Sequence, residues 1–190
     1  MVNIQQQIRA GSLNAQIGVV ISSRGDVKGV ERARDLGCEP VIIRRKDHQD
    51  IESFSDAISR LLRDNKIDLV VQAGWLCLWH IPADYVNRVM NIHPALLPSF
   101  GGQGMWGHHV HEAVLKAGCK ISGCTVHFCT NEYDKGPIIV QRSCPAYDGD
   151  SPDELAARVF EQECLAYPEA IKLFEQGKLK VESGIVRISR

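Results

Sequence analysis

Strand-like and helix-like patterns alternate along the first half of the chain. Three short apolar runs have the length and composition of buried strands, at residues 15–22, 39–44 and 69–74. Helical periodicity is found between these runs and before them, at residues 4–8, 28–36 and 53–63. This β-α-β-α-β order predicts an α/β protein with a Rossmann-like open, mostly parallel sheet and helices on both of its faces.

The second half adds shorter connections between its elements. Strands are predicted at residues 89–92, 123–130 and 137–142, and a helix at residues 108–116. The short return between the last two strands favours antiparallel pairing. Ser151, Pro152 and Glu154 form a capping-box start for a helix that should end before Gly177, with a strand-like tail from Lys178. No repeat or linker is visible, so a single domain of residues 1–190 is predicted.

Composition narrows the class of protein. The 190 residues are 44% hydrophobic and 24% charged, and the formal net charge of −1 argues against nucleic acid or an anionic membrane as a partner. No apolar run approaches the roughly 20 residues that a membrane span needs. The seven cysteines show no metal-site spacing and several lie in apolar strands, which indicates free thiols in a reducing cytoplasm.

The polar pair Asn91 and His93 stands where a buried strand meets Pro94. Proline must end the strand there, and open α/β sheets place their ligand sites at such carboxyl ends. We expect the turn at Pro94 to bring both side chains into one cleft. Asp134, in a later loop, would hold His93 charged, so the trio suits acyl or one-carbon transfer. The alternatives are a packed structural histidine at position 93 and a turn-forming aspartate before Gly136.

Other candidates carry weaker signals. His108 and His111 have a helical i,i+3 spacing beside Glu112, but a polar helix start is favoured over a zinc site. His127 is better explained as a hydrogen-bonded core histidine than as a ligand. The glycine-rich segment 101–107 is either a lid or a mobile surface loop. No dinucleotide, Walker or nucleophile-elbow motif is present.

Several motifs together resemble one family. They are Asn91-Ile-His-Pro-Ala-Leu-Leu-Pro98, Ser122-Gly-Cys-Thr-Val-His-Phe128, Asp134-Lys-Gly-Pro-Ile-Ile139 and Gln141, with further matches at Gly29-Val-Glu-Arg-Ala-Arg34 and Leu69-Val-Val-Gln-Ala-Gly-Trp75. The set is similar to the formyltetrahydrofolate-dependent formyltransferases, and the likeness extends from about Asn3 to the end of the chain. Within that family, the chain is most similar to members that act on glycinamide ribonucleotide in de novo purine biosynthesis.

The resemblance implies roles for individual residues. Asn91 would stabilise an oxyanion, His93 would be the proton donor, and Asp134 would raise the pKa of His93. The pterin of 10-formyltetrahydrofolate, the co-substrate, would be bound by Asn91 and by Cys77, Leu78, Trp79, His80, Thr130, Asn131, Glu132, Tyr133 and Asp134. The ribonucleotide would contact Glu163 with Phe160, Glu161 and Gln162, and also Asn3. Residues 101–111 correspond to a mobile active-site loop in a longer variant.

The implied activity is transfer of a formyl group to the amine of glycinamide ribonucleotide, without a metal. Two alternatives stay open: hydrolysis of 10-formyltetrahydrofolate, and a truncated folate-binding relic without turnover. The expected partners are small molecules, with the chain a monomer or a homodimer. The resemblance implies that related formyltransferases acting on methionyl-tRNA, and the deformylases, carry an extra domain. From the length of 190 residues we expect neither of these two activities.

The start of the chain departs from the family pattern. The family begins with an apolar strand and a glycine-rich loop that holds the substrate phosphate at a helix N-terminus. Here Met1 enters at the end of that loop. We therefore expect a formyltransferase fold that lacks its usual first strand, with unpaired sheet edges and a damaged phosphate site.

Overall fold

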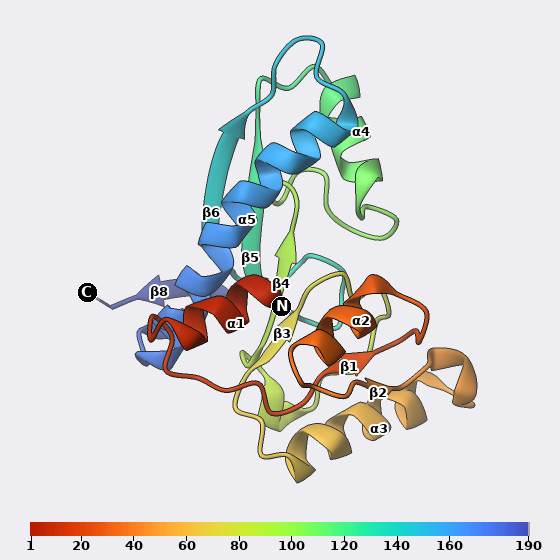
Figure 1. The fold of residues 1–190 in the computed structure, drawn as a ribbon. Helices are drawn as coiled ribbons and strands as arrows, with labels where there is room; N and C mark the ends of the chain where they lie inside the picture. The colour runs from red at the N-terminus through yellow and green to blue at the C-terminus, as the bar shows by residue number, and fades with distance from the viewer. Residues whose placement is uncertain (190) are drawn as a thin grey trace. The chain divides into compact units, whose positions relative to one another are not determined.

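The computed structural model describes residues 1–189. These fall into two compact units, residues 1–89 and residues 90–189. Figure 1 shows the chain coloured from red at the N-terminus to blue at the C-terminus, so the first unit runs from red to yellow-green and the second from green to blue. Each unit is built from both helices and strands, as the sequence predicts.

The first unit contains a parallel strand pair and three α-helices. Its elements are α1 (Val2–Arg9), β1 (Ile21–Ser22), α2 (Lys28–Asp35), β2 (Val41–Ile42), a 3-10 turn (Arg45–Asp47), α3 (Ile51–Asp64), β3 (Val70–Gln72) and a second 3-10 turn (Ala83–Tyr85). β1 and β2 are parallel, with Ile21 opposite Val41. The helix connecting them, α2, buries Val30 and Ala33, which confirms the predicted β-α-β unit.

α3 shows why this sequence forms a helix. Asp50 accepts from the Ser53 backbone N–H at 2.7 Å, and the Ser53 hydroxyl completes a capping box. Phe54, Ile58 and Leu62, spaced four residues apart, are all buried on one helical face. The predicted helix at residues 53–63 is therefore confirmed, and capping extends it to Ile51–Asp64.

The strands of this unit are shorter than their apolar runs. Only Ile21 and Ser22 of the predicted strand 15–22 belong to β1, and β2 and β3 have two and three residues. A strand requires a hydrogen-bonded partner as well as apolar side chains. Ile17 and Val19, in the part of the run outside β1, are only half-buried.

The second unit is organised around three antiparallel strands. Its elements are β4 (Val89–His93), α4 (His108–Lys116), β5 (Ile121–Phe128), β6 (Ile138–Pro145), α5 (Pro152–Glu175), β7 (Leu179–Glu182) and β8 (Ile185–Ile188). β5 pairs antiparallel with both β4 and β6, and a bulge interrupts the second pairing between Val126 and His127. The long green and teal strands of Figure 1 are β5 and β6. The predicted antiparallel return is confirmed.

α5 begins as the sequence predicts and continues through Pro168 without a break. The Ser151 side chain accepts from the Glu154 backbone N–H, and Pro152 occupies the first turn. The buried face of α5 includes Leu155, Val159 and Ala166. In addition, the buried Tyr167 hydroxyl donates to the Met90 carbonyl at 3.0 Å, which ties α5 to β4. The helix therefore packs against β5 and β6 and is bonded to the strand that carries Asn91 and His93.

The α/β class is confirmed, and the two kinds of strand pairing divide between the units. Parallel pairing lies in the first unit, and the antiparallel pairings lie in the second. Within residues 1–189, no helix is long and apolar enough to cross a membrane.

Candidate active site

Strand register places the candidate residues on one face of the second unit's sheet. Asn91 lies opposite His127, and His93 lies opposite Thr125. Residues two apart on a strand share a face, so Asn91 and His93 point the same way while still within β4. The expectation that a turn at Pro94 brings them together was therefore wrong. The strand itself does so.

Two contacts orient the imidazole of His93, whose residue is only 3% exposed. Its Nε2 lies 2.7 Å from the Phe100 carbonyl oxygen. A carbonyl can only accept, so Nε2 carries the hydrogen. Its Nδ1 faces Asp134 Oδ2 at 3.6 Å. Nδ1 is therefore the nitrogen that is available to exchange a proton beside the carboxylate.

Asp134 contacts both the loop that follows His93 and the imidazole of His127. The backbone N–H of Gly102 donates to Oδ2 at 2.8 Å, and His127 Nε2 lies 3.6 Å from Oδ1. Asp134 also adopts a left-handed backbone with φ of 55°, which aspartate tolerates better than most residues. Burial alone would raise the pKa of Asp134, but the His127 and Gly102 contacts and the neighbouring imidazoles together lower it. The carboxylate is thus ionised at neutral pH.

The pKa of His93 is lowered from its ordinary value, which corrects the sequence prediction. Burial is the largest cause, because removal from water disfavours the cation. Asp134 and the Phe100 carbonyl act in the predicted direction and raise the pKa, but they do not outweigh burial. His93 is consequently a mostly neutral imidazole at neutral pH.

His127 is a site residue that the sequence analysis placed only in the core. It is 2% exposed, and its Nδ1 lies 2.9 Å from the Phe128 carbonyl oxygen, so Nδ1 carries the hydrogen. In the neutral ring, Nε2 then accepts from the Asn91 side-chain amide at 3.4 Å. This contact directs the Asn91 NH2 group along the sheet face. The sequence alone could not show that His127 belongs to this cluster, because its place opposite Asn91 depends on the register between β4 and β5.

The segment after His93 folds back over the site. Phe100 has a positive φ of 55°, and an added Cβ at Gly101 would meet the Leu97 side chain and come within 3.2 Å of Asp134 Cβ. Glycine therefore leaves room for the loop to pass close to Asp134. Phe100 and Gly102 contact His93 and Asp134 directly, so this part of the loop packs against the cluster, and its role as a lid stays a prediction.

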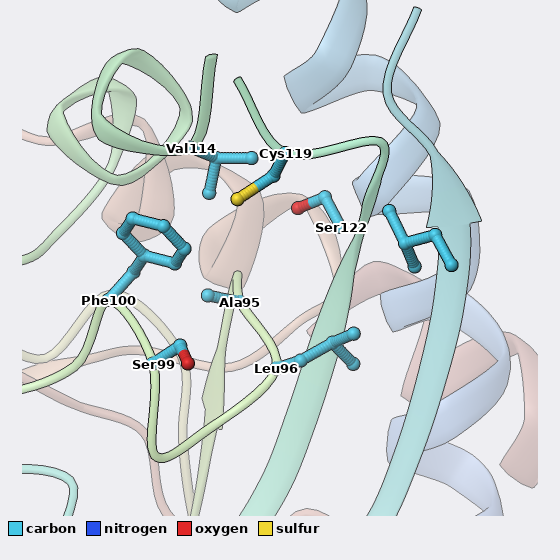
Figure 2. Close-up of a pocket in the computed structure, with 8 residues that line it drawn as sticks. Ala95, Leu96, Ser99, Phe100, Val114, Cys119 and Ser122 are labelled. Carbon is cyan, nitrogen blue, oxygen red and sulfur yellow. The ribbon is translucent and has the colours of Figure 1, made fainter. Parts of the chain in front are cut away.

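A small cavity of about 140 Å³ lies behind this segment. Figure 2 shows the Phe100 ring, Ala95 and Leu96 from the loop facing Val114, Cys119 and Ser122 across it. Most of this lining is apolar, and neither Asn91 nor Asp134 contributes to it. The cavity is thus distinct from the cluster around His93.

Two of the three histidines of α4 lie beside exposed carboxylates, and the third is buried. His108 pairs with Asp153 at 3.4 Å and His109 with Glu112 at 3.7 Å, all on exposed side chains. His111 is buried, and burial lowers its pKa. No group of three potential ligands that could hold a metal occurs among residues 1–189.

The expected folate-binding residues fall in both units. Thr130, Asn131, Glu132 and Tyr133 form an exposed turn that leads from β5 to Asp134. Cys77, Leu78, Trp79 and His80 belong to the first unit, where Trp79 is buried and the His80 N–H donates to Ser55 Oγ at 2.8 Å. Within the second unit, the structure brings together Asn91, His93 and Asp134 and joins the turn to them.

The expected ribonucleotide contacts on α5 differ in accessibility. Phe160 is 60% exposed and Glu161 is also exposed, whereas Gln162 and Glu163 are partly buried. Burial raises the pKa of Glu163 to about 7, and its charge acts on the Cys124 thiol of β5. Asn3 lies in α1 of the first unit. Glu163 is therefore the residue of this set whose environment is most unusual.

Comparison with known proteins assigns the family. Residues 1–171 match the model of the formyl transferase family, described as "Formyl transferase". The chain therefore belongs to the formyl transferase family. It is 36% identical over 175 residues to a chloroplastic phosphoribosylglycinamide formyltransferase of Arabidopsis thaliana, covering 90% of this chain and 59% of that protein. It is 32% identical to phosphoribosylglycinamide formyltransferase of Haemophilus influenzae, covering 96% of this chain and 86% of that protein.

Solved structures agree on the fold. Glycinamide ribonucleotide transformylase 1 from Symbiobacterium toebii superposes with a TM-score of 0.91 at 37% identity, covering 99% of this chain and 87% of that one. A formyltetrahydrofolate deformylase from Pseudomonas syringae superposes with a TM-score of 0.82 at 24% identity, covering 100% of this chain and 61% of that one. This likeness supports the shared fold and says nothing about activity. The chain spans only 59% and 55% of the two chloroplastic relatives.

Proposed function

We propose that this chain transfers the formyl group of 10-formyltetrahydrofolate to the amine of glycinamide ribonucleotide in purine biosynthesis. The observation that carries the proposal is that Asn91 and His93 share one sheet face and that His93 Nδ1 is turned toward Asp134 of the following loop. The relatives at 32–37% identity are named for this reaction, which supports the choice of substrates.

The cluster suits proton transfer between two nitrogen atoms. The substrate amine attacks the formyl carbon, a C–N bond forms, and the carbonyl oxygen becomes an oxyanion that accepts from the Asn91 amide. Neutral His93 takes the amine proton at Nδ1 and gives it to N10 of the folate as the C–N10 bond breaks. One proton leaves the amine and one reaches N10, so no proton comes from solution. Asp134 stabilises His93 while it is charged.

Binding is assigned to residues that flank this cluster. The turn of Thr130, Asn131, Glu132 and Tyr133 would contact the pterin, as would Cys77, Leu78, Trp79 and His80 of the first unit. The ribonucleotide would contact Asn3 and, on α5, Phe160, Glu161, Gln162 and Glu163. We expect a cytoplasmic enzyme that is a monomer or a homodimer and acts on small molecules without a metal.

The test is formyl transfer measured with purified protein, with folate release followed in parallel without the ribonucleotide. Ribonucleotide-dependent release supports the proposal, and release without it identifies a hydrolase. Folate binding without any release identifies the non-catalytic relic. His93→Ala should abolish transfer, whereas Lys120→Ala, which removes an exposed ion pair with Asp148, should not.

A further inference from the structure

Three residues form a row across β4, β5 and β6. His93 lies opposite Thr125, and Thr125 lies opposite Gln141. All three share the sheet face that also carries Asn91. The row therefore reaches from the candidate proton carrier on β4 to a polar residue two strands away.

The Thr125 hydroxyl holds the loop that follows His93. It donates to the Ala95 carbonyl at 2.7 Å and accepts from the Leu97 N–H at 3.0 Å. It also accepts from Gln141 Nε2 at 3.0 Å. A hydroxyl offers one donor and two acceptor sites, so Thr125 is fully used. Thr125 itself is 0% exposed, which makes these bonds difficult to replace with water.

The Gln141 amide makes a second bond to the same loop. Its Nε2 donates to the Leu97 carbonyl at 2.9 Å in addition to Thr125. The residue as a whole is exposed, so its side chain is not part of the hydrophobic core. Both N–H groups of its amide are nevertheless used in hydrogen bonds, one to Leu97 of the loop and one to Thr125.

Phe100 connects this network to His93. It follows Leu97 by three residues, and its carbonyl is the only protein group described within hydrogen-bonding distance of His93 Nε2 in residues 1–189. Its φ of 55° is unfavourable for a bulky side chain, so the surrounding contacts must keep it there. A loop released at Leu97 would let Phe100 relax and the carbonyl move away.

We infer that Gln141 and Thr125 are positioning residues for His93: by fixing residues 95–97 they hold the Phe100 carbonyl on Nε2 and so keep Nδ1 turned toward Asp134. The inference rests on the proposed function, in which Nδ1 moves the proton. It adds two residues that touch neither substrate and act through the backbone of the loop.

The pKa of His93 can be measured to test this inference, because a general loss of stability would not change it. The groups that act on it electrostatically are Asp134, His127 and His111. The Phe100 bond raises the pKa of His93, and its loss leaves these other groups in place. With His93 still buried, losing the Phe100 bond should therefore lower the pKa of His93 further.

The experiment compares Gln141→Met with Arg142→Met in the full chain. The two substitutions introduce the same side chain at adjacent positions of β6, and Arg142 points to the opposite face, where it pairs with Glu169 at 2.7 Å. Thr125→Val and Thr125→Ser form a second pair that removes or keeps the hydroxyl. The pKa of His93 is measured by NMR of labelled histidine without substrate, and kcat, KM and the pH–rate profile are measured with both substrates.

Gln141→Met should lower the His93 pKa and reduce kcat by about 10- to 100-fold, with little change in KM, because small misplacements of a reacting group have effects of this size. Thr125→Val should also lower the His93 pKa and kcat. Thr125→Ser, which keeps the hydroxyl, should leave both near their wild-type values, and Arg142→Met should change neither the pKa nor kcat. An unmoved His93 pKa in Gln141→Met overturns the inference, even if thermal stability falls. If the wild type shows no formyl transfer, the proposed function fails, but the NMR titration still decides the positioning role.

Discussion

Glu163 should make the stability of this protein depend on pH in an unusual direction. Its carboxyl lies partly buried on α5, and burial alone raises its pKa from 4.5 to about 7. No hydrogen bond or ion pair of Glu163 occurs among the described residues to offset the loss of water, so the neutral form is favoured in the folded protein. In the unfolded chain the same carboxyl ionises near its ordinary value.

The sign and size follow from this difference. A raised folded-state pKa gives stability that is fully present below about pH 4.5 and is lost as the pH rises through about 7. The shift corresponds to up to about 3 kcal/mol, at 1.36 kcal/mol for each pKa unit. Glu163→Gln keeps the shape and removes the charge. The variant should therefore match the wild type at about pH 4 and be more stable by up to about 3 kcal/mol at about pH 8.

Urea unfolding across this pH range measures the effect. Glu161→Gln is the matched control, because Glu161 is exposed on the same helix and its replacement should be nearly neutral. If Glu163 also contacts the ribonucleotide, Glu163→Gln should raise the KM for that substrate while folate binding stays unchanged. A difference in stability that is the same at every pH would refute the assignment of a buried, mostly neutral carboxyl.

Three further substitutions test the site itself. His93→Ala should abolish turnover while folate binding, measured by fluorescence or calorimetry, is largely kept; an unchanged kcat would remove His93 from the mechanism. Asp134→Asn removes the charge that raises the pKa of His93, so the acidic limb of the pH–rate profile should move to lower pH; an unmoved limb would mean that the two groups do not interact. Gly136→Ala should destabilise by roughly 1–3 kcal/mol in denaturant unfolding, because an added Cβ would collide with the Phe128 carbonyl oxygen; a neutral result would mean that this close approach is not rigid.

Helix ends and one antiparallel return were predictable because they depend on local chemistry and on the length of a short connection. Ser151 and Glu154 specify the start of α5, and residues 53–63 carry the apolar face of α3. The antiparallel return to β6 follows from a connection too short for a crossover. The candidate residues Asn91, His93 and Asp134 were likewise found from the sequence, and the structure groups them.

Register and strand length were not predictable, because they depend on partners distant in sequence. Residues 15–22 form an apolar run, yet only two of them pair with β2. His127 was assigned to the core correctly, but its contact with Asn91 follows from a pairing between strands 36 residues apart. The role inferred for Gln141 depends on the same kind of pairing, between β5 and β6. Such contacts become visible only when the sheet is assembled.

Burial also reverses the simplest expectation about the pair His93 and Asp134. A carboxylate beside an imidazole favours the cation, but here burial dominates for His93, whereas His127, Gly102 and His93 together outweigh burial for Asp134. The resting pair is therefore a carboxylate facing the unprotonated Nδ1 of a neutral ring, two acceptors that share no hydrogen, which accounts for their separation of 3.6 Å. A proton delivered to Nδ1 converts this contact into a charge pair in a dry environment, where the attraction is strongest. The arrangement thus favours taking up the amine proton, and handing it on to the leaving nitrogen restores the resting state.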